Sequence, residues 1–327
     1  MITMTEIASL TGVSQATVSR ALNGSASVRP EIAKKVLDCA REHNYQPNFI
    51  AQSLVGNKTY LIGLVVSDIG NPFFAELAKA IEREARKRKY SIMLFSTDYN
   101  VAKEEEDLEI IRRYKTDGLI FTPASKDDDV VDKRLKYEIP SVSVTIDMRR
   151  LDSVFVSHAE AGEQVARHFL GLGHESFLFI GSKDDDKELG FLAGLDKGGV
   201  DIERDYFYSS EKGSHWRNAV AELVKARPGA AIFAHNDLQA IQVLEALKEL
   251  EVSVPQDVAL AGFDNTFLGK ITTPTLTSVA QPIDEMGRLA VERLVEKIEG
   301  SGEGPAIRCK LEARLVARGS TLQMARI

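Results

Sequence analysis

The sequence predicts an N-terminal all-α unit followed by an α/β core made of two doubly wound lobes. Three observations predict this fold class. The first 46 residues contain start and stop signals for three short helices. From residue 60 onward, short β-rich apolar runs alternate with helical patterns, and this alternation occurs in two successive series. The length of 327 residues allows about two domains with room for a small third.

The composition argues against a membrane protein or a disulfide-rich one. Apolar residues make up 44% of the chain and charged residues 27%, which is a globular composition. The apolar runs, such as residues 61–66, are far shorter than the ~18–20 residues that a membrane span needs. Cys39 and Cys309 lie far apart in the sequence, and no basic region followed by an apolar core opens the chain. We therefore expect a cytoplasmic protein without a membrane partner.

Charge is unevenly distributed along the chain. The net charge is −7, yet residues 1–58 hold six basic and four acidic side chains. The other 269 residues hold 35 basic and 44 acidic side chains. A mildly basic N-terminal segment on an acidic body means that we expect any phosphate contact to be confined to that segment.

Local signals define the first two helices. Thr3 and Glu6 have the spacing of a capping box, and Gly12 is suited to end the helix that follows them. Ser14 is a good N-cap for a second helix over residues 15–22.

A third helix is expected over residues 31–42, because Pro30 favours a helical first turn. The apolar residues on one face of this helix are Ile32, Val36, Leu37 and Ala40. A helix, a glycine-containing turn, a second helix and a supporting helix together form a helix-turn-helix unit.

The second helix carries side chains suited to DNA contact. Its apolar positions, which can pack inward, are Ala16, Val18, Ala21 and Leu22. The positions left for solvent or DNA are Gln15, Thr17, Ser19, Arg20 and Asn23. Small hydroxylated residues let a helix sit deep in a major groove, and Arg20 and Gln15 can hydrogen-bond base edges or phosphates. The alternative is a three-helix domain with an ordinary polar surface.

Two α/β series are expected in the core. The predicted strands cover residues 61–66, 91–95, 118–122, 141–144 and 154–156, and then 177–180, 206–208, 231–234 and 258–262. The predicted helices cover residues 73–88, 103–114, 130–137, 160–172, 187–196, 214–225 and 237–250. Ligands of doubly wound folds bind beyond the carboxyl ends of the strands, so two facing lobes predict a ligand cleft.

Residues 12–23 closely resemble the recognition segment of the LacI/GalR (lactose-repressor/galactose-repressor) family of bacterial transcription regulators. The resemblance continues through residues 45–48, 51–54, 67–74, 262–265 and 275–282 and covers almost the whole chain. It implies a ligand-responsive repressor of carbohydrate-utilisation genes, with a core similar to that of periplasmic sugar-binding proteins. The implied partners are a pseudo-palindromic double-stranded operator and a small-molecule effector. No heptad tail follows residues 315–318, so a homodimer is the simplest expectation.

The resemblance also implies the domain boundaries. The helix-turn-helix headpiece is expected over residues 1–46, and the hinge helix with its linker over residues 47–59. The effector-binding and dimerisation core is expected over residues 60–327. Its lobe 1 is placed at about residues 60–157 and 281–312, and its lobe 2 at about residues 158–280 and 313–327.

The predicted DNA contacts are Thr3, Ser14, Gln15, Ala16, Thr17, Ser19, Arg20, Asn23, Asn48, Ala51 and Leu54. Gln15, Ala16 and Arg20 are expected to face the major groove, with Thr3 and Ser14 nearer phosphate. The resemblance implies that the hinge helix lies in the minor groove and that Leu54 wedges into the central base step. A helix of about eight residues is too short to be stable alone in water, so a plain linker fits the free state equally well.

The positions that match family effector contacts are Asn71, Phe73, Phe74, Lys187, Asn236, Asp264 and Gln281. Aromatic faces stack on a sugar ring, and carboxylate and amide groups bind its hydroxyls. Phe73 and Phe74 could instead start a buried helix, and Asp264 could be an ordinary turn residue. The family usually has Arg where Lys187 stands, and Lys is a point charge that lacks the bidentate grip of Arg. A polyol, a sugar acid and a sugar phosphate therefore all stay open as the effector.

No catalytic, metal or cofactor site is expected. The sequence has no P-loop, no Gly-x-Ser-x-Gly elbow and no His-Glu-x-x-His, and its six histidines lack ligand spacing and are interpreted as structural or solvated. The acidic runs at residues 127–129 and 184–186 lack a calcium-loop pattern and are interpreted as solvated loops. A sugar-binding protein without DNA function would leave residues 3–23 unexplained. An α/β enzyme of carbohydrate metabolism would need a catalytic set that the sequence does not offer.

Overall fold

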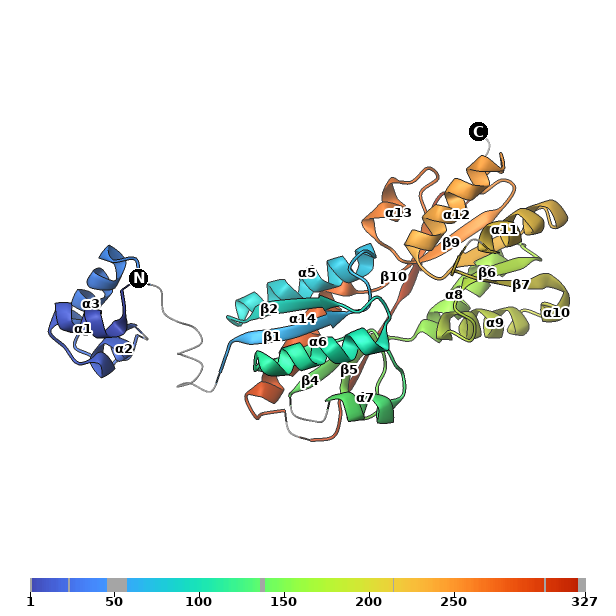
Figure 1. The fold of residues 1–327 in the computed structure, drawn as a ribbon. Coiled ribbons are helices and arrows are strands. Elements are labelled where there is room, and N and C mark those ends of the chain that lie inside the picture. Colours follow the sequence, from blue (N-terminus) through green and yellow to red (C-terminus); the bar gives the residue numbers. More distant parts are fainter. Residues whose placement is uncertain are drawn as a thin grey trace. The chain divides into compact units, whose positions relative to one another are not determined.

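The computed structural model describes residues 2–22, 24–45, 58–135, 139–213, 215–302 and 304–322. The chain divides into two compact units, Met1–Thr59 and Tyr60–Ile327, and each is described here by itself (Figure 1). The expected hinge helix falls on residues 46–57, which lie outside the described residues. Among the described residues, no helix is both long enough and apolar enough to cross a membrane.

The elements of the N-terminal unit follow the local signals in its sequence. Its helices are α1 (Met4–Thr11), α2 (Gln15–Leu22) and α3 (Pro30–Glu42). The capping box is confirmed, because Glu6 N donates to Thr3 Oγ1 at 3.3 Å and Thr3 N donates to Glu6 Oε2 at 2.7 Å. Gly12 ends α1 in the left-handed conformation at φ 69°, which glycine adopts at little cost. At the start of α2, Thr17 N donates to Ser14 Oγ at 3.2 Å.

The three helices enclose a small apolar core in which Ile7, Val18 and Val36 are fully buried. Two predictions of inward packing are wrong, because Leu37 is 38% exposed and Ala16 is exposed. Each helical residue rotates by about 100°, which puts Leu37 off the Val36 side of α3. The same rotation puts Ala16 on the opposite side of α2 from Val18. Ala16 is therefore open to solvent, as the predicted DNA contact requires.

The Tyr60–Ile327 unit contains two six-stranded sheets in its described part. The first sheet has the strand order β11-β5-β4-β3-β1-β2, and all neighbouring strands are parallel. Its strands are β1 (Leu61–Val66), β2 (Ser91–Ser96), β3 (Gly118–Phe121), β4 (Ser141–Val144), β5 (Asp152–Val156) and β11 (Arg308–Leu311). The second sheet has the order β12-β10-β9-β8-β6-β7 and is parallel except between β10 and β12. Its strands are β6 (Phe177–Gly181), β7 (Tyr206–Ser210), β8 (Ala231–Ala234), β9 (Ala259–Asp264), β10 (Thr277–Ala280) and β12 (Arg314–Val316).

Helices cover both faces of each sheet, and we call each sheet with its helices a lobe (Figure 1). In the first lobe, α5 and α14 pack on one face and α6 and α7 on the other. In the second lobe, α8 and α9 pack on one face and α11 and α12 on the other. The helices are α5 (Pro72–Lys87), α6 (Val101–Arg113), α7 (Asp128–Leu135), α8 (His158–Gly171), α9 (Asp186–Lys197), α10 (Ile202–Asp205), α11 (His215–Ala226), α12 (Asp237–Glu249), α13 (Phe267–Ile271) and α14 (Ile283–Ile298). Strands covered on both faces need apolar side chains on both, which is why β1 is a continuous apolar run.

The described chain passes between the lobes from β5 to α8, from β10 to α14 and from β11 to β12. The sequence pattern does not reveal β10, β11, β12 and α14, nor the short helices α10 and α13. The strands β11 and β12 are short edge strands, and the charged residues Arg308, Lys310 and Arg314 interrupt their apolar pattern. Their strand conformation depends on pairing with β5 and β10, which lie far away in the sequence.

Candidate functional site

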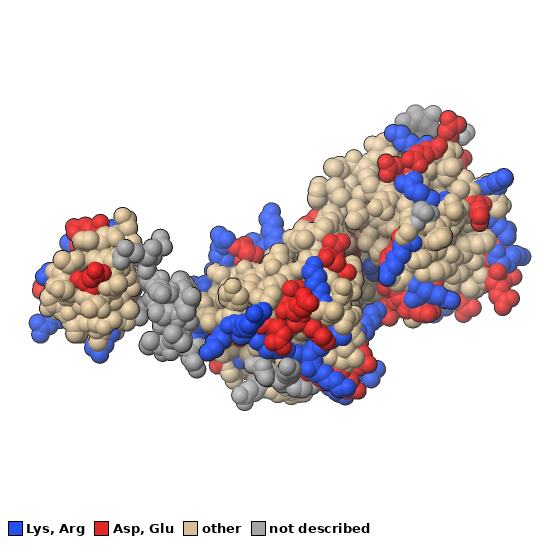
Figure 2. All heavy atoms as spheres, viewed as in Figure 1, with Lys and Arg blue, Asp and Glu red and all other residues tan. Residues whose placement is uncertain are grey.

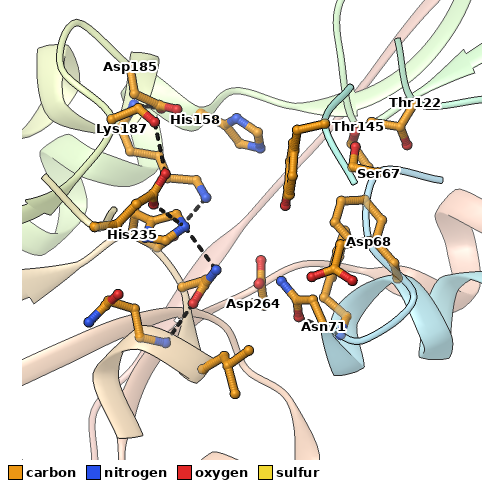
Figure 3. Close-up of a pocket in the computed structure, with 18 of the residues that line it drawn as sticks. Ser67, Asp68, Asn71, Thr122, Thr145, His158, Asp185, Lys187, His235 and Asp264 are labelled. Carbon is orange, nitrogen blue, oxygen red and sulfur yellow. Dashed lines mark hydrogen bonds and ion pairs between the residues drawn. The ribbon is translucent and has the colours of Figure 1, made fainter. Parts of the chain in front are cut away.

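A cavity of about 580 Å³ lies between the two lobes, at the carboxyl ends of their parallel strands (Figure 3). The residues that follow the strands line it, with Ser67 after β1, Thr122 after β3 and Thr145 after β4. Ser182 follows β6 and His235 follows β8 on the opposite wall. The volume falls in the range of roughly 300–1,000 Å³ that is typical of small-molecule sites.

The fold brings all of the predicted effector residues to this cavity. They come from α5, α9, the ends of β8 and β9 and the start of the crossing to α14: Asn71, Phe73, Phe74, Lys187, Asn236, Asp264 and Gln281. Their contact with an effector stays a prediction.

Asp264, the last residue of β9, lies at the centre of the close-up in Figure 3. Its side chain is 5% exposed, and its Oδ1 accepts a hydrogen bond from Gln281 Nε2 at 2.8 Å. Burial raises the pKa of Asp264 to about 7; Lys187 acts in the opposite direction and Asp237 adds to the increase. A buried carboxyl at a strand end is not an ordinary solvated turn residue.

Asn71, Phe73 and Phe74 form the start of α5 on the first-lobe wall. Asn71 is the N-cap, and its Oδ1 accepts from Phe73 N at 3.0 Å. Phe73 and Phe74 are 3% and 7% exposed and pack edge to face with ring centroids 5.1 Å apart. Both rings therefore belong to the apolar core of the first lobe and also line the cavity.

Lys187 is 9% exposed and is held within the second lobe. Its Nζ donates to the carbonyl oxygen of His235 at 2.8 Å and lies 4.1 Å from the centroid of the Phe263 ring. Burial, together with the nearby Lys187 charge, lowers the pKa of His158 to about 3. Burial raises the pKa of Asp185, but the Lys187 ammonium and the Lys187 N–H outweigh it and leave that pKa lowered.

Several residues that line the cavity were not predicted from the sequence. They are polar or aromatic side chains: Asp68, Tyr99, Asp185, Glu211 and the imidazoles of His158 and His235. His158 and His235 both line the cavity, and the interpretation of the histidines as structural or solvated stays a prediction. The interpretation of residues 184–186 as a solvated loop is wrong for Asp185, whose Oδ1 accepts from Lys187 N at 2.8 Å as the N-cap of α9. All of these lining residues lie close in sequence to the end of a core strand or the start of a core helix, and this position was the signal by which they could have been found.

The N-terminal unit presents much of the predicted DNA-contact set on its surface. Gln15, Ala16 and Arg20 are exposed on α2, while Thr17 and Ser19 are half-buried. The two residues at helix starts, Thr3 and Ser14, are exposed as well. The predicted contacts Asn23, Asn48, Ala51 and Leu54 lie outside the described residues. Figure 2 shows acidic and basic side chains interspersed on the visible face of the Tyr60–Ile327 unit rather than gathered in a basic patch.

Comparison with known proteins agrees with the division of the chain into an N-terminal helical unit and a two-lobed unit. Residues 3–48 match the model of "Bacterial regulatory proteins, lacI family", and residues 166–321 match that of "Periplasmic binding protein-like domain". The chain is 33% identical to the HTH-type transcriptional regulator DegA of Bacillus subtilis (strain 168), over 87% of this chain and 88% of that protein. It is 30% identical to the ribose operon repressor of Escherichia coli (strain K12), over 91% of this chain and 93% of that protein.

A solved structure has the same fold. The crystal structure of the lac repressor dimer bound to operator and the anti-inducer ONPF superposes with a TM-score of 0.86. That likeness covers 98% of this chain and 99% of the other at 22% sequence identity.

A helix-turn-helix unit joined to a two-lobed unit with a ligand cavity defines a ligand-responsive DNA-binding transcription regulator. The chain belongs to the lacI family of bacterial regulatory proteins.

Proposed function

We propose that the protein is a dimeric repressor of carbohydrate-utilisation genes, and that a small sugar-like effector sets its affinity for a pseudo-palindromic operator. The observation that carries the proposal is the pairing of a capped helix-turn-helix unit with a cavity that all seven predicted effector residues line. The names of relatives such as the ribose operon repressor support the class of regulated genes. The protein is proposed to act in the cytoplasm without enzymatic activity.

In the N-terminal unit, α2 is the proposed reading helix. The exposed side chains of Gln15 and Arg20 carry the donors and acceptors that base edges in a major groove require. Exposed Ala16 adds little bulk between them, so that the helix can approach the bases closely. Thr3 and Ser14 lie just before helix starts, where hydroxyls and backbone amides suit phosphate contacts.

In the core, Asp264, Asn71 and Gln281 are the proposed hydroxyl-binding groups, and Phe73 and Phe74 supply the apolar side of the cavity. Asn236 N-caps α12 through its Oδ1, which accepts from Gln239 N at 2.8 Å. Its Nδ2 lies 2.9 Å from His235 Nε2, and both residues line the cavity. This mixture of aromatic faces and fixed polar groups is typical of sites for small hydroxylated ligands.

Binding at two distant sites needs an element with two states between them. We place that element in residues 47–59, of which 47–57 lie outside the described residues; the hinge helix expected there is too short to be stable alone in water. The proposed boundaries are those expected from the sequence: a headpiece at 1–46, the hinge at 47–59 and a core at 60–327. Within the core, the chain passes back and forth between the two lobes. An effector then changes operator affinity by its differential affinity for the two hinge states.

The test selects operator DNA from a library of random duplexes with the purified chain and measures its affinity by gel shift. A pseudo-palindromic selected site, and an affinity that changes when a sugar stabilises the protein in a thermal-shift screen, are the expected results. Arg20→Ala removes the selection, whereas the matched control Arg113→Ala, an exposed residue at the end of α6, leaves it intact. Failure to select any sequence would refute the proposed function.

A further inference from the structure

Five carboxylates line the cavity, and each follows or ends a different strand; Asp98, after β2, is paired with Lys103 at 2.7 Å. Asp68 follows β1, Asp185 lies between β6 and α9, Glu211 follows β7 and Asp264 ends β9. Figure 3 shows Asp68 and Asp264 in the middle of the site, and Asp185 on the second-lobe wall. Both lobes therefore contribute acidic groups to one small space.

Tyr99 lines the same cavity and is 60% exposed. The pKa of its hydroxyl therefore responds to the carboxylates there. Partial desolvation in the cavity raises the pKa of Tyr99. The charges of Asp264, Asp68, Glu211 and Asp185 raise it further. Four of the five lining carboxylates thus act electrostatically on one hydroxyl group.

Except for Lys212, the cationic groups of the lining are engaged with the protein itself or are uncharged. Lys187 Nζ donates to the His235 carbonyl oxygen at 2.8 Å, and Lys126 Nζ pairs with Asp186 at 2.7 Å. His235 Nε2 lies 2.7 Å from Glu211 Oε2, and the lowered pKa of His158 leaves that imidazole neutral. Lys212 is exposed at the rim. The described lining thus holds five carboxyl groups and three lysines, so acidic groups outnumber basic ones in the cavity.

Two buried amides point independently to a polar ligand. Gln281 is 8% exposed, and its Oε1 has no hydrogen-bond partner among the described residues. Gln239 is 6% exposed, and its Nε2 likewise has no partner within the described part of the chain. A buried polar atom without a partner costs about 1–3 kcal/mol, and a ligand that supplies the missing bond removes that cost. Gln281 Oε1 needs a donor and Gln239 Nε2 needs an acceptor, and a hydroxylated amine can supply both.

We propose that the effector is a hydroxylated molecule that carries a protonated amine, such as an amino sugar, and that the cavity excludes sugar phosphates and sugar acids. This inference rests on the proposed function, of which it specifies the effector class. An ammonium group supplies three donors and a positive charge to the acceptors of Asp68, Asp264 and Gln281. A phosphate or carboxylate would bring a second negative charge into an acidic, partly buried space, where charges are weakly screened.

The experiment titrates the full chain by calorimetry at pH 7 with matched sets of probes. Glucosamine, galactosamine and mannosamine are each compared with the parent hexose, its N-acetyl derivative, its 6-phosphate and its aldonic acid. We expect one amine to bind at least about tenfold more tightly than its parent and its N-acetyl derivative, because a charged hydrogen bond is stronger than a neutral one. The 6-phosphate and the aldonic acid should bind more weakly than the parent.

Asp68→Asn, which keeps an oxygen to accept the 2.8 Å bond from Gly70 N, should remove most of the preference for the amine. The matched control Asp201→Asn changes an exposed acid that is not among the described residues lining the cavity, and it should leave the preference intact. Tighter binding of a phosphate, an acid or the neutral parent overturns the inference, as does binding of none of the amines. Operator selection by gel shift in the same preparation shows separately whether the proposed function stands.

Discussion

Gln281 Nε2 donates a hydrogen bond to Asp264 Oδ1 at 2.8 Å, and both side chains are buried. Asp264 ends β9 in the second lobe, whereas Gln281 lies at the point where the chain leaves β10 for α14 in the first lobe. One hydrogen bond therefore joins a proposed effector-binding carboxyl to a crossing between the lobes. A ligand that engages Asp264 also acts on the segment that connects the lobes.

Asp264→Ala should weaken effector binding by about 1–3 kcal/mol or more, because ligand hydroxyls and Gln281 Nε2 would lose their acceptor. Calorimetric titration with the sugar that the screen identifies measures the loss. Operator affinity without effector should survive if the effector is an inducer. An unchanged titration in both Asp264→Ala and Lys187→Ala would place the effector site elsewhere.

Asp264 should also make stability depend on pH near neutrality. Its pKa in the folded protein is raised to about 7 from 3.8, so the folded state keeps a proton that the unfolded state releases between those values. This contribution therefore lowers the free energy of unfolding as the pH rises from about 4 to 7, by at most about 1.4 kcal/mol per pH unit. Above pH 7 it levels off. In urea unfolding from pH 5 to 8, the stability of Asp264→Asn should increase relative to the wild type up to pH 7. Parallel plots of unfolding free energy against pH would contradict this.

Gly190 should tolerate no side chain. A Cβ at Gly190 would lie 1.9 Å from the carbonyl oxygen of Ala159, at the point where α9 packs on α8. Gly190→Ala should therefore destabilise the second lobe by about 1–3 kcal/mol or more, because backbone atoms must move. Gly171→Ala is the control, since a Cβ there meets nothing within 4 Å. Thermal unfolding of both variants measures the difference. Equal unfolding midpoints would contradict the prediction, because they would show that α8 and α9 move apart at little cost.

Arg20→Ala should weaken binding to the selected operator by about 1–3 kcal/mol if its guanidinium contacts a base edge. Its exposed position near the end of α2 leaves it free to do so. Binding to random DNA should change much less, because non-specific affinity comes from phosphate contacts. Equal losses on both DNAs in a gel shift would reassign Arg20 to a phosphate.

Leu54 lies outside the described residues and is the proposed minor-groove wedge. Leu54→Ala should keep the fold, the dimer and the effector affinity. It should lose much of the operator affinity and most of the effector response. An inserted leucine kinks the duplex at a cost of a few kcal/mol for unstacking, and the bent DNA offsets that cost by making more contacts with the protein. Operator binding with and without effector, together with amide exchange over residues 48–56, tests this. Wild-type affinity and response, or a hinge already protected without DNA, would argue against the mechanism.

The sequence by itself determined the elements whose signals are local. The Thr3–Glu6 capping box and Gly12 set the bounds of α1, because caps act over three or four residues. Buried parallel strands such as β1 and β8 were predicted at their observed bounds, because continuous apolar runs mark them directly. Motifs at strand ends also identified residues such as Asp264 and Asn236, which the fold brings to one cavity.

Only the tertiary structure decided which distant residues meet. The edge strands β11 and β12 form by pairing with strands more than 30 residues away in the sequence, and no local pattern specifies that partner. Lys187 lines the cavity as predicted from the sequence, but the contacts of its Nζ with the His235 carbonyl and the Phe263 ring arise only in the fold. Tyr99 and Glu211 likewise join the cavity through the parallel sheets, whose strand ends gather residues that the sequence keeps apart. Burial and charge at the site are sums over such contacts, and they arise only once the chain is folded.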